Sequence, residues 1–320
     1  MEKPPTPNTT IKHKGFHHII NAEVRSYIKK HDINSLATVE EKIDGSNLFF
    51  ASNGMDAACG SKRDLLNDTA KFYNFQALLH LKKSILELYR KLSVSDVTIY
   101  LYGEIIPTQK RIKYVNDGIY FVAFDLKVVP FGQEEDDTIK STWMARDKWA
   151  PVATECGFIV NPILLRGTLE ECLKYDVENS KSIIPKLLDK NSTLVSIIEG
   201  VVIKGDGFTV KKKASAFREM ETGGGVKFVK TTDPNETAVG ELIGSMLTES
   251  RLSNIVSQIG SDMQPDAPRL ANTVVLDAIE EAKDDEKSVI YKISKNKVSK
   301  IQRVLAADFV DTVKKYMNWI

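Results

Sequence analysis

The stretch TVEEKIDGSNLFF, residues 38–50, contains two runs typical of β-strands on either side of Asp44-Gly45. The pair Asp-Gly is favoured in two-residue type I′ turns, so the stretch predicts a β-hairpin. In that hairpin Lys42 would face Asn47 across the strands, and both side chains would lie on one face of the sheet. Taken alone, the stretch is better explained as an exposed lysine beside an ordinary hairpin.

Further β-like runs follow as far as about residue 230 and then stop. They are rich in Val, Ile, Tyr and Phe: VTIYLYGEIIP (97–107), GIYFVAFDLKVV (118–129) and SIIEGVVIKGDGFTVKKK (196–213). Asp233 and Pro234 then suit the cap and first position of a helix, and apolar residues recur at helical spacing from Leu252 to Ile259. The sequence therefore predicts an α+β domain over 1–232, with a disordered tail at about 1–12, and an all-helical domain over 233–320.

Composition excludes several classes of protein. A chain of 320 residues with 42% hydrophobic and 27% charged residues suits a globular protein with two domains. The 44 basic and 43 acidic residues nearly balance, so a nucleic-acid surface would have to be a local patch. The three cysteines form no CxxC pair, which favours a reducing, intracellular compartment, cytoplasmic or nuclear. No stretch is apolar enough for a membrane span, and no targeting segment is evident.

A second hairpin is predicted where Lys204 is followed by Gly-Asp-Gly. Counting back from a three-residue loop places Glu199, Lys211 and Lys213 on one face. A carboxylate and two ammonium groups on one face suggest a site for phosphate and metal. Lys204 and Lys212 would lie on the opposite face, unless a bulge shifts the register by one residue. A solvated basic strand is the alternative interpretation.

Lys42 gains significance from charged and aromatic residues in the later β-like runs. A lysine nucleophile must lose its proton, which requires desolvation or neighbouring cations. Attack on a nucleotide α-phosphate also needs positive charge on the phosphate oxygens, carboxylates for a divalent metal and an aromatic face for the base. Groups of each kind follow along the chain: Arg63, Glu104, Phe124, Glu199, Lys211 and Lys213.

In this order and spacing the segments resemble the covalent lysine nucleotidyltransferases, the superfamily of ATP-dependent DNA ligases, RNA ligases and mRNA capping enzymes. The resemblance implies an antiparallel-sheet nucleotidyltransferase (adenylyltransferase) domain in which Lys42 is the nucleophile that becomes lysyl-AMP. It also implies that Glu199 helps to hold a metal. The implied nucleotide-binding residues are Asn47, Arg63, Glu104 (ribose), Phe124 (stacking on the base), Lys211 and Lys213 (phosphates). Further candidates are Glu41, Asp44, Lys204 and Asp125.

The helical C-terminal domain separates the branches of this superfamily, because DNA ligases and capping enzymes carry an OB-fold there. The chain resembles the RNA ligase 2-like family of ATP-dependent RNA ligases. The resemblance implies joining of 3′-hydroxyl and 5′-phosphate RNA ends through lysyl-AMP and adenylylated RNA, with ATP as AMP donor and Mg²⁺ or Mn²⁺. A monomer acting at nicks or bridged breaks in duplex RNA, in repair or editing, is expected. The alternatives are a DNA ligase or an mRNA capping guanylyltransferase and, more remotely, an inactive RNA-binding module.

A basic stretch in the helical domain is a candidate RNA-binding surface. It contains no acidic residue and six basic ones: Lys287, Lys292, Lys295, Lys297, Lys300 and Arg303. The stretch suits either contact with RNA phosphates or a solvated helix face.

Overall fold

The computed structural model describes residues 10–17, 19–22, 25–62, 64–70, 72–107, 112–131, 142–215, 217, 225–259, 266–283 and 288–317. Most of the expected disordered tail, residues 1–9, lies outside the described residues. Packed structure begins as early as Ile11, which is buried against the aromatic side of a sheet. None of the described helices is both long and apolar enough to cross a membrane.

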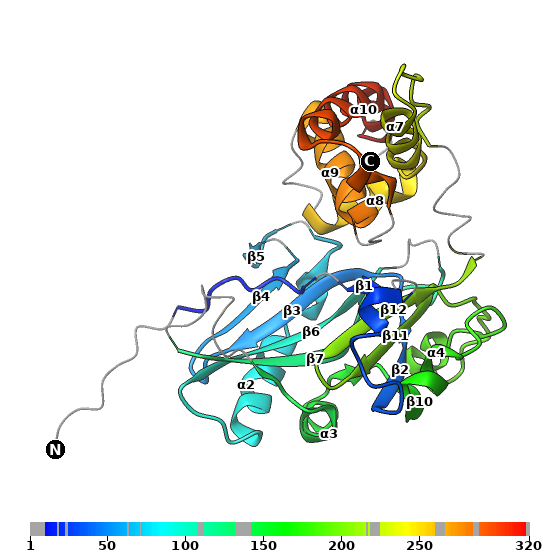
Figure 1. Ribbon diagram of the computed structural model, residues 1–320. Helices are drawn as coiled ribbons and strands as arrows, with labels where there is room; N and C mark the ends of the chain where they lie inside the picture. Colours follow the sequence, from blue (N-terminus) through cyan, green and yellow to red (C-terminus); the bar gives the residue numbers. More distant parts are fainter. Residues whose placement is uncertain are drawn as a thin grey trace.

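The first part of the described chain forms two sheets of mainly antiparallel strands (Figure 1). One sheet has the order β1-β12-β11-β2-β10, and the other has the order β5-β4-β3-β6-β7-β8, with β9 pairing with β7. The strands are β1 (Ile20–Asn21), β2 (Leu36–Lys42), β3 (Ser46–Ser52), β4 (Ala57–Ser61), β5 (Leu65–Leu66), β6 (Val97–Ile106), β7 (Tyr120–Pro130), β8 (Thr142–Trp143), β9 (Ile159–Val160), β10 (Ile163–Thr168), β11 (Gly200–Gly205) and β12 (Phe208–Lys213).

Helices cover the sheets and then make up the C-terminal part of the chain, as the fold-class prediction stated. Those between the strands are α1 (Arg25–Ile28), η1 (Phe75–Leu78), α2 (Leu81–Lys91), α3 (Arg146–Glu155), α4 (Leu169–Leu173) and α5 (Ile184–Leu188). Those that follow are α7 (Pro234–Ser245), α8 (Glu249–Ile259), α9 (Ala267–Lys283), η2 (Val289–Lys292) and α10 (Lys295–Met317).

The strands β2 and β3 do not form the predicted hairpin, because they belong to different sheets. β2 pairs with β10 and β11, whereas β3 pairs with β4 and β6. Neither Asp44 nor Gly45 has the positive φ that a type I′ turn requires. Gly45 permits a close approach instead, since a Cβ there would lie 2.8 Å from the Ile105 carbonyl oxygen and 2.9 Å from Glu104 Cβ. The residues between β2 and β3 therefore carry the chain from one sheet to the other.

The second predicted hairpin forms between β11 and β12, but with a register shifted by one residue. Gly205 pairs with Phe208 and so belongs to the strand rather than to the loop. This shorter loop places Lys204 on the same face as Lys211 and Lys213. The prediction that Lys204 lies on the opposite face is therefore wrong.

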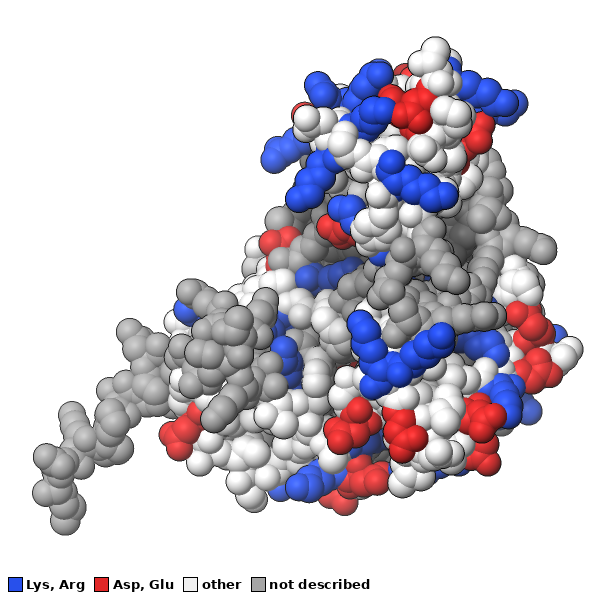
Figure 2. Space-filling view, viewed as in Figure 1, with Lys and Arg blue, Asp and Glu red and all other residues white. Residues whose placement is uncertain are grey.

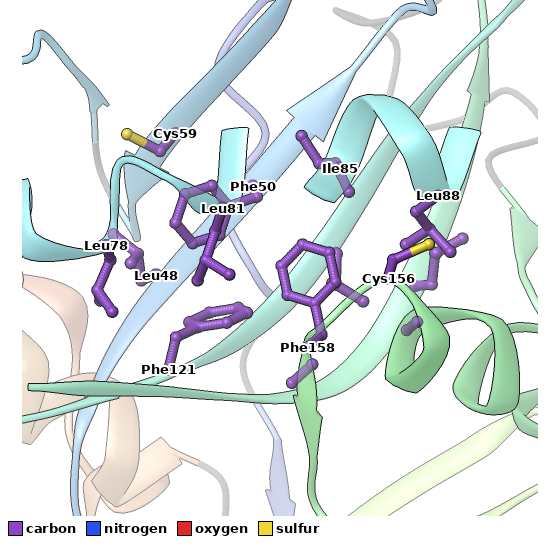
Figure 3. Packing of buried hydrophobic residues seen from close by; sticks show 14 of the residues in the cluster. Leu48, Phe50, Cys59, Leu78, Leu81, Ile85, Leu88, Phe121, Cys156 and Phe158 are labelled. Atoms are coloured by element: carbon purple, nitrogen blue, oxygen red, sulfur yellow. The ribbon is translucent and has the colours of Figure 1, made fainter. Parts of the chain in front are cut away.

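An apolar core joins the larger sheet to α2 and α3 (Figure 3). Leu81, Ile85 and Leu88 recur at helical spacing on α2 and are buried, so one stripe of this helix faces the sheet. Phe50 and Phe121 meet them from β3 and β7. This packing fixes the strands that carry the site on their other face.

The C-terminal helices have a hydrophobic core of their own. Its buried members run from Val239 to Val313, all from the helical part of the chain. Helix α7 begins at Pro234 and has the predicted cap, because the Asp233 side chain accepts hydrogen bonds from the backbone N–H groups of Asn235 and Glu236. Two separate cores are what two domains would show.

Candidate active site

A single pocket between the two sheets gathers nearly all of the predicted site residues. Its lining includes Lys42, Asn47, Glu104, Phe124, Glu199, Lys211 and Lys213, together with the further candidates Glu41, Asp44, Lys204 and Asp125. The remaining candidate, Arg63, lies outside the described residues, while its neighbour Lys62 lines the pocket. Residues spread over much of the chain therefore converge because β2, β3, β6, β7, β11 and β12 all border one space.

Lys42, the last residue of β2, forms an ion pair with Glu199. The distance between Lys42 Nζ and Glu199 Oε1 is 2.5 Å. Glu199 is nearly buried, whereas the lysine side chain remains 25% exposed, so a ligand in the pocket can reach the amine. An adjacent carboxylate favours the ammonium form of a lysine. Glu199 must therefore change partner before Lys42 can act as a nucleophile.

Asn47, near the start of β3, has a buried side-chain oxygen beside Glu104. Asn47 lies directly opposite Glu104 on the neighbouring strands β3 and β6. Its Nδ2 donates to the Gly103 carbonyl oxygen at 3.4 Å, while its Oδ1 is buried and has no hydrogen-bond partner among the described residues. Such an unpaired acceptor beside a carboxylate suits a hydroxyl-bearing ligand.

Asp44 is buried and serves the backbone around it. Its Oδ2 accepts a hydrogen bond from the Ile112 N–H at 3.1 Å, and its own N–H donates to the Tyr114 hydroxyl at 2.9 Å. These bonds hold residues 112–114 against the crossover between the sheets. Asp44 thus shapes the wall of the pocket through the backbone and is not needed to contact a ligand.

Lys204 lies beside Phe124 in a fully partnered buried network. Its Nζ donates to Glu40 Oε2 at 3.1 Å, to the Phe124 carbonyl oxygen at 2.9 Å and to Asp125 Oδ1 at 3.0 Å. Burial opposes the charge of Lys204, but Asp125 and Glu40 outweigh burial and raise its pKa. Lys204 therefore stays charged and anchors β11 to the end of the pocket that carries the Phe124 ring.

The helix α9 of the C-terminal domain brings two carboxylates, Asp277 and Glu281, to the same pocket. Arg251 of α8 holds both, with its guanidinium 2.5 Å from Asp277 Oδ2 and 2.8 Å from Glu281 Oε2. Burial alone would raise the pKa of Glu281, but Arg251, Lys213 and Lys211 lower it to about 2. An anionic helix face therefore lies beside the paired lysines.

Glu41 differs from its neighbours because its side chain belongs to the opposite face of β2. Its Oε2 accepts a hydrogen bond from the Ile183 N–H at 3.0 Å, and its buried Oε1 has no hydrogen-bond partner among the described residues. Burial is the main cause that raises the pKa of Glu41 to about 7, and the nearby Glu199 adds to it. This carboxyl therefore titrates close to neutral pH.

Sequence reasoning missed Glu40, Arg146 and Asn161. Arg146 pairs with Glu40 Oε1 at 3.0 Å, and Asn161 Nδ2 donates to the Glu41 carbonyl oxygen at 2.9 Å. The sequence held one signal for Glu40: it is two residues before Lys42 in the same strand, so both side chains lie on one face of the sheet. Arg146 and Asn161 come from segments with no motif around them.

The fold and this pocket are those of a nucleotidyltransferase domain followed by helices, and comparison with known proteins identifies the branch. The family model described as RNA ligase matches residues 36–217, and the one described as T4 RNA ligase 2 C-terminal matches residues 230–310. The chain belongs to the RNA ligase family, in its RNA ligase 2-like branch.

Individual proteins similar to this chain include a curated relative and several solved structures. The mitochondrial RNA-editing ligase 1 of Trypanosoma brucei brucei is 28% identical over 184 residues, covering 45% of this chain and 38% of the relative. The chain thus matches less than half of that relative's length. Similar solved structures include a Naegleria gruberi RNA ligase variant with ATP and Mn, at 18% identity and a TM-score of 0.48 over 68% of this chain and 59% of that one. The same ligase with PPi has 18% identity and a TM-score of 0.48, over 68% and 63%.

Proposed function

We propose that this protein is an ATP-dependent RNA ligase that joins 3′-hydroxyl and 5′-phosphate RNA ends through lysyl-AMP and adenylylated-RNA intermediates. The observation that carries the proposal is the single pocket in which Lys42 meets Glu104, Glu199 and the paired lysines of β12. Nucleophile, carboxylates and phosphate-binding cations are the set that nucleotidyl transfer to a lysine requires.

The reaction proceeds in three transfers. Lys42 Nζ attacks the α-phosphorus of ATP, the bond to the β-phosphate oxygen breaks, and pyrophosphate leaves. The 5′-phosphate of an RNA end then displaces Lys42 from AMP, which restores the free lysine and leaves an adenylylated end. Attack by a 3′-hydroxyl forms the phosphodiester and releases AMP. Lys211 and Lys213 line the pocket where they would stabilise phosphate charge, and the ring of Phe124 would support the base.

Glu199 is the residue that would hold a divalent metal. The described residues contain no cluster of three or more His, Cys, Asp or Glu side chains placed to bind an ion. Mg²⁺ commonly binds through one or two carboxylates together with substrate phosphates, so Glu199 in a phosphate-binding pocket fits such an ion. When bound, Mg²⁺ or Mn²⁺ would neutralise phosphate charge.

The C-terminal helices would engage the RNA. Of the basic stretch, Lys287 lies outside the described residues, while Lys292, Lys295, Lys300 and Arg303 are exposed. Figure 2 shows basic side chains spread over this domain and over the surface below it. Lys297 and Lys300 are less suited to RNA binding, because they pair with Asp233 and Glu236 at the start of α7. The exposed basic side chains of this stretch support phosphate contacts along a duplex with a nick or a bridged break.

The environment and assembly of the protein are also proposals. All three cysteines are buried and free, which supports a reducing compartment. We expect a monomer.

A nick-sealing assay tests the proposed substrate. Two duplexes of equal sequence carry a 5′-phosphate nick, one with ribonucleotides at the 3′-hydroxyl end and one made entirely of DNA. We expect faster sealing of the ribonucleotide nick, because 2′-hydroxyls distinguish RNA at a given site. A preference for the all-DNA nick would favour the DNA ligase alternative, and covalent labelling by GTP would favour a capping enzyme.

A further inference from the structure

Asn161 lies beside the aromatic ring that would support the base, and its position is fixed by the backbone. The short strand β9 runs parallel to β7, with Val160 opposite Ala123. The Asn161 N–H donates to the Ala123 carbonyl oxygen at 2.8 Å, which places Asn161 next to Phe124. The residue is 2% exposed and lines the pocket.

The charged groups around Asn161 are engaged with one another. Lys204 has three N–H donors, and all three are used within the protein. Arg146 donates to Glu40 and to the Asn161 carbonyl oxygen. Both oxygens of Glu40 accept from these cations. Lys204 therefore has no donor left for a base, and Arg146 is not part of the pocket lining.

Two acceptor oxygens fix the orientation of the Asn161 side-chain amide. Its Nδ2 lies 2.9 Å from the Glu41 carbonyl oxygen and 3.5 Å from Glu40 Oε2, and both of these atoms can only accept. The reverse orientation would place oxygen against oxygen, so the amide nitrogen must face β2. Asn161 Oδ1 is then left buried with no hydrogen-bond partner among the described residues. A buried polar atom of this kind calls for a ligand.

We infer that Asn161 Oδ1 accepts a hydrogen bond from the 6-amino group of adenine and thereby makes the pocket select ATP over GTP. Adenine carries a donor at position 6, whereas guanine carries a carbonyl oxygen there. In the same pose GTP would bring that oxygen against the amide oxygen and leave both unsatisfied, which is costly in a buried site. This inference rests on the proposed function, because it concerns the base of the nucleotide that Lys42 attacks.

The first test needs only the unaltered protein. The rate constant kcat/KM for formation of the lysyl-nucleotide is measured with ATP and with purine riboside 5′-triphosphate, which lacks the 6-amino group. We expect ATP to be favoured by about 10- to 100-fold, since loss of the amine leaves Asn161 Oδ1 unpaired. Equal values for the two nucleotides would overturn the inference without any mutation.

The second test separates direct contact from support of the pocket. In Asn161→Leu and Asn161→Ala the preference for ATP over purine riboside triphosphate should fall close to one, with the change in KM rather than in kcat. If Asn161 only supports the fold, its replacement would lower kcat/KM equally for both nucleotides and leave the preference intact. That result would contradict the inference. Asn191→Leu, at an exposed position away from the pocket, is the matched control and should keep the preference.

The two levels of the proposal fail differently. A protein that forms lysyl-AMP but does not distinguish the two purines contradicts the role of Asn161 alone. A protein that forms no lysyl-nucleotide with any triphosphate contradicts the proposed function and, with it, the role of Asn161.

Discussion

Glu41 shows how one buried side chain next to the nucleophile can make stability depend on pH. Below its ordinary pKa the carboxyl is protonated in both the folded and the unfolded chain. Between about pH 4.5 and about pH 7 the unfolded chain releases this proton while the folded protein, whose pKa is raised to about 7, retains it. The folded protein then binds more protons, so its contribution to the free energy of unfolding falls as pH rises.

Glu41→Gln should therefore stabilise the protein at pH 8 and have a smaller effect at pH 5. The shift in pKa corresponds to about 3 kcal/mol at most. Thermal unfolding of the variant and of the unaltered protein across this pH range measures the difference. A difference in Tm that does not vary with pH would mean that Glu41 is charged in the folded protein throughout.

The strand β12 carries three consecutive lysines whose roles differ by face. Lys211 and Lys213 line the pocket, whereas Lys212 Nζ donates to the carbonyl oxygens of Leu173 and Tyr175, each at 3.0 Å. Lys211→Ala and Lys213→Ala should each reduce lysyl-AMP formation by orders of magnitude. Lys212→Ala should reduce it little and instead lower Tm, because two partly buried carbonyl groups lose their donor. Single-turnover labelling with ATP measures the first effect, and equal damage from all three variants would mean that the strand faces are misplaced.

The elements were predictable from sequence to the extent that local pattern decides them. The β-like composition of 118–129, the Asp233 cap and the helical spacing of apolar residues from Leu252 to Ile259 all concern residues close in sequence, and the structure has the corresponding strand and helices. Which strands pair depends on residues distant in sequence. The local signal of Asp44-Gly45 therefore predicts a turn, although β2 and β3 belong to different sheets. Asn161 could not be predicted as a site residue for the same reason, since the parallel pairing of β9 with β7 brings it to the pocket.

At the scale of the whole molecule, the buried core of the C-terminal helices begins at Val239, whereas the buried cores around the two sheets end at Phe217. We propose the boundary near Thr232, and a chain ending there should fold and still form lysyl-AMP, because every residue proposed for ATP chemistry precedes it. It should transfer AMP poorly to a 5′-phosphate RNA end, since the basic surface is lost. Both reactions can be followed with labelled ATP in the presence and absence of nicked duplex RNA. Nick sealing by the truncated chain at the rate of the full chain would remove the C-terminal helices from RNA engagement.

The full chain also brings two carboxylates of α9, Asp277 and Glu281, to the pocket that contains the paired lysines. A triphosphate and Glu281 would both be drawn to Lys211 and Lys213. The truncated chain should for this reason form lysyl-AMP at least as fast as the full one.

The most direct test of the central claim is to identify the residue that carries the nucleotide. The pure protein is incubated with a divalent metal and labelled ATP or GTP, digested, and the labelled peptide is sequenced by mass spectrometry. The label should come from ATP and lie on Lys42, and it should be absent from Lys42→Ala and from Lys42→Arg, because an arginine keeps its proton and cannot attack phosphorus. A label on another residue, labelling of either variant, or preferential labelling by GTP would contradict the assignment.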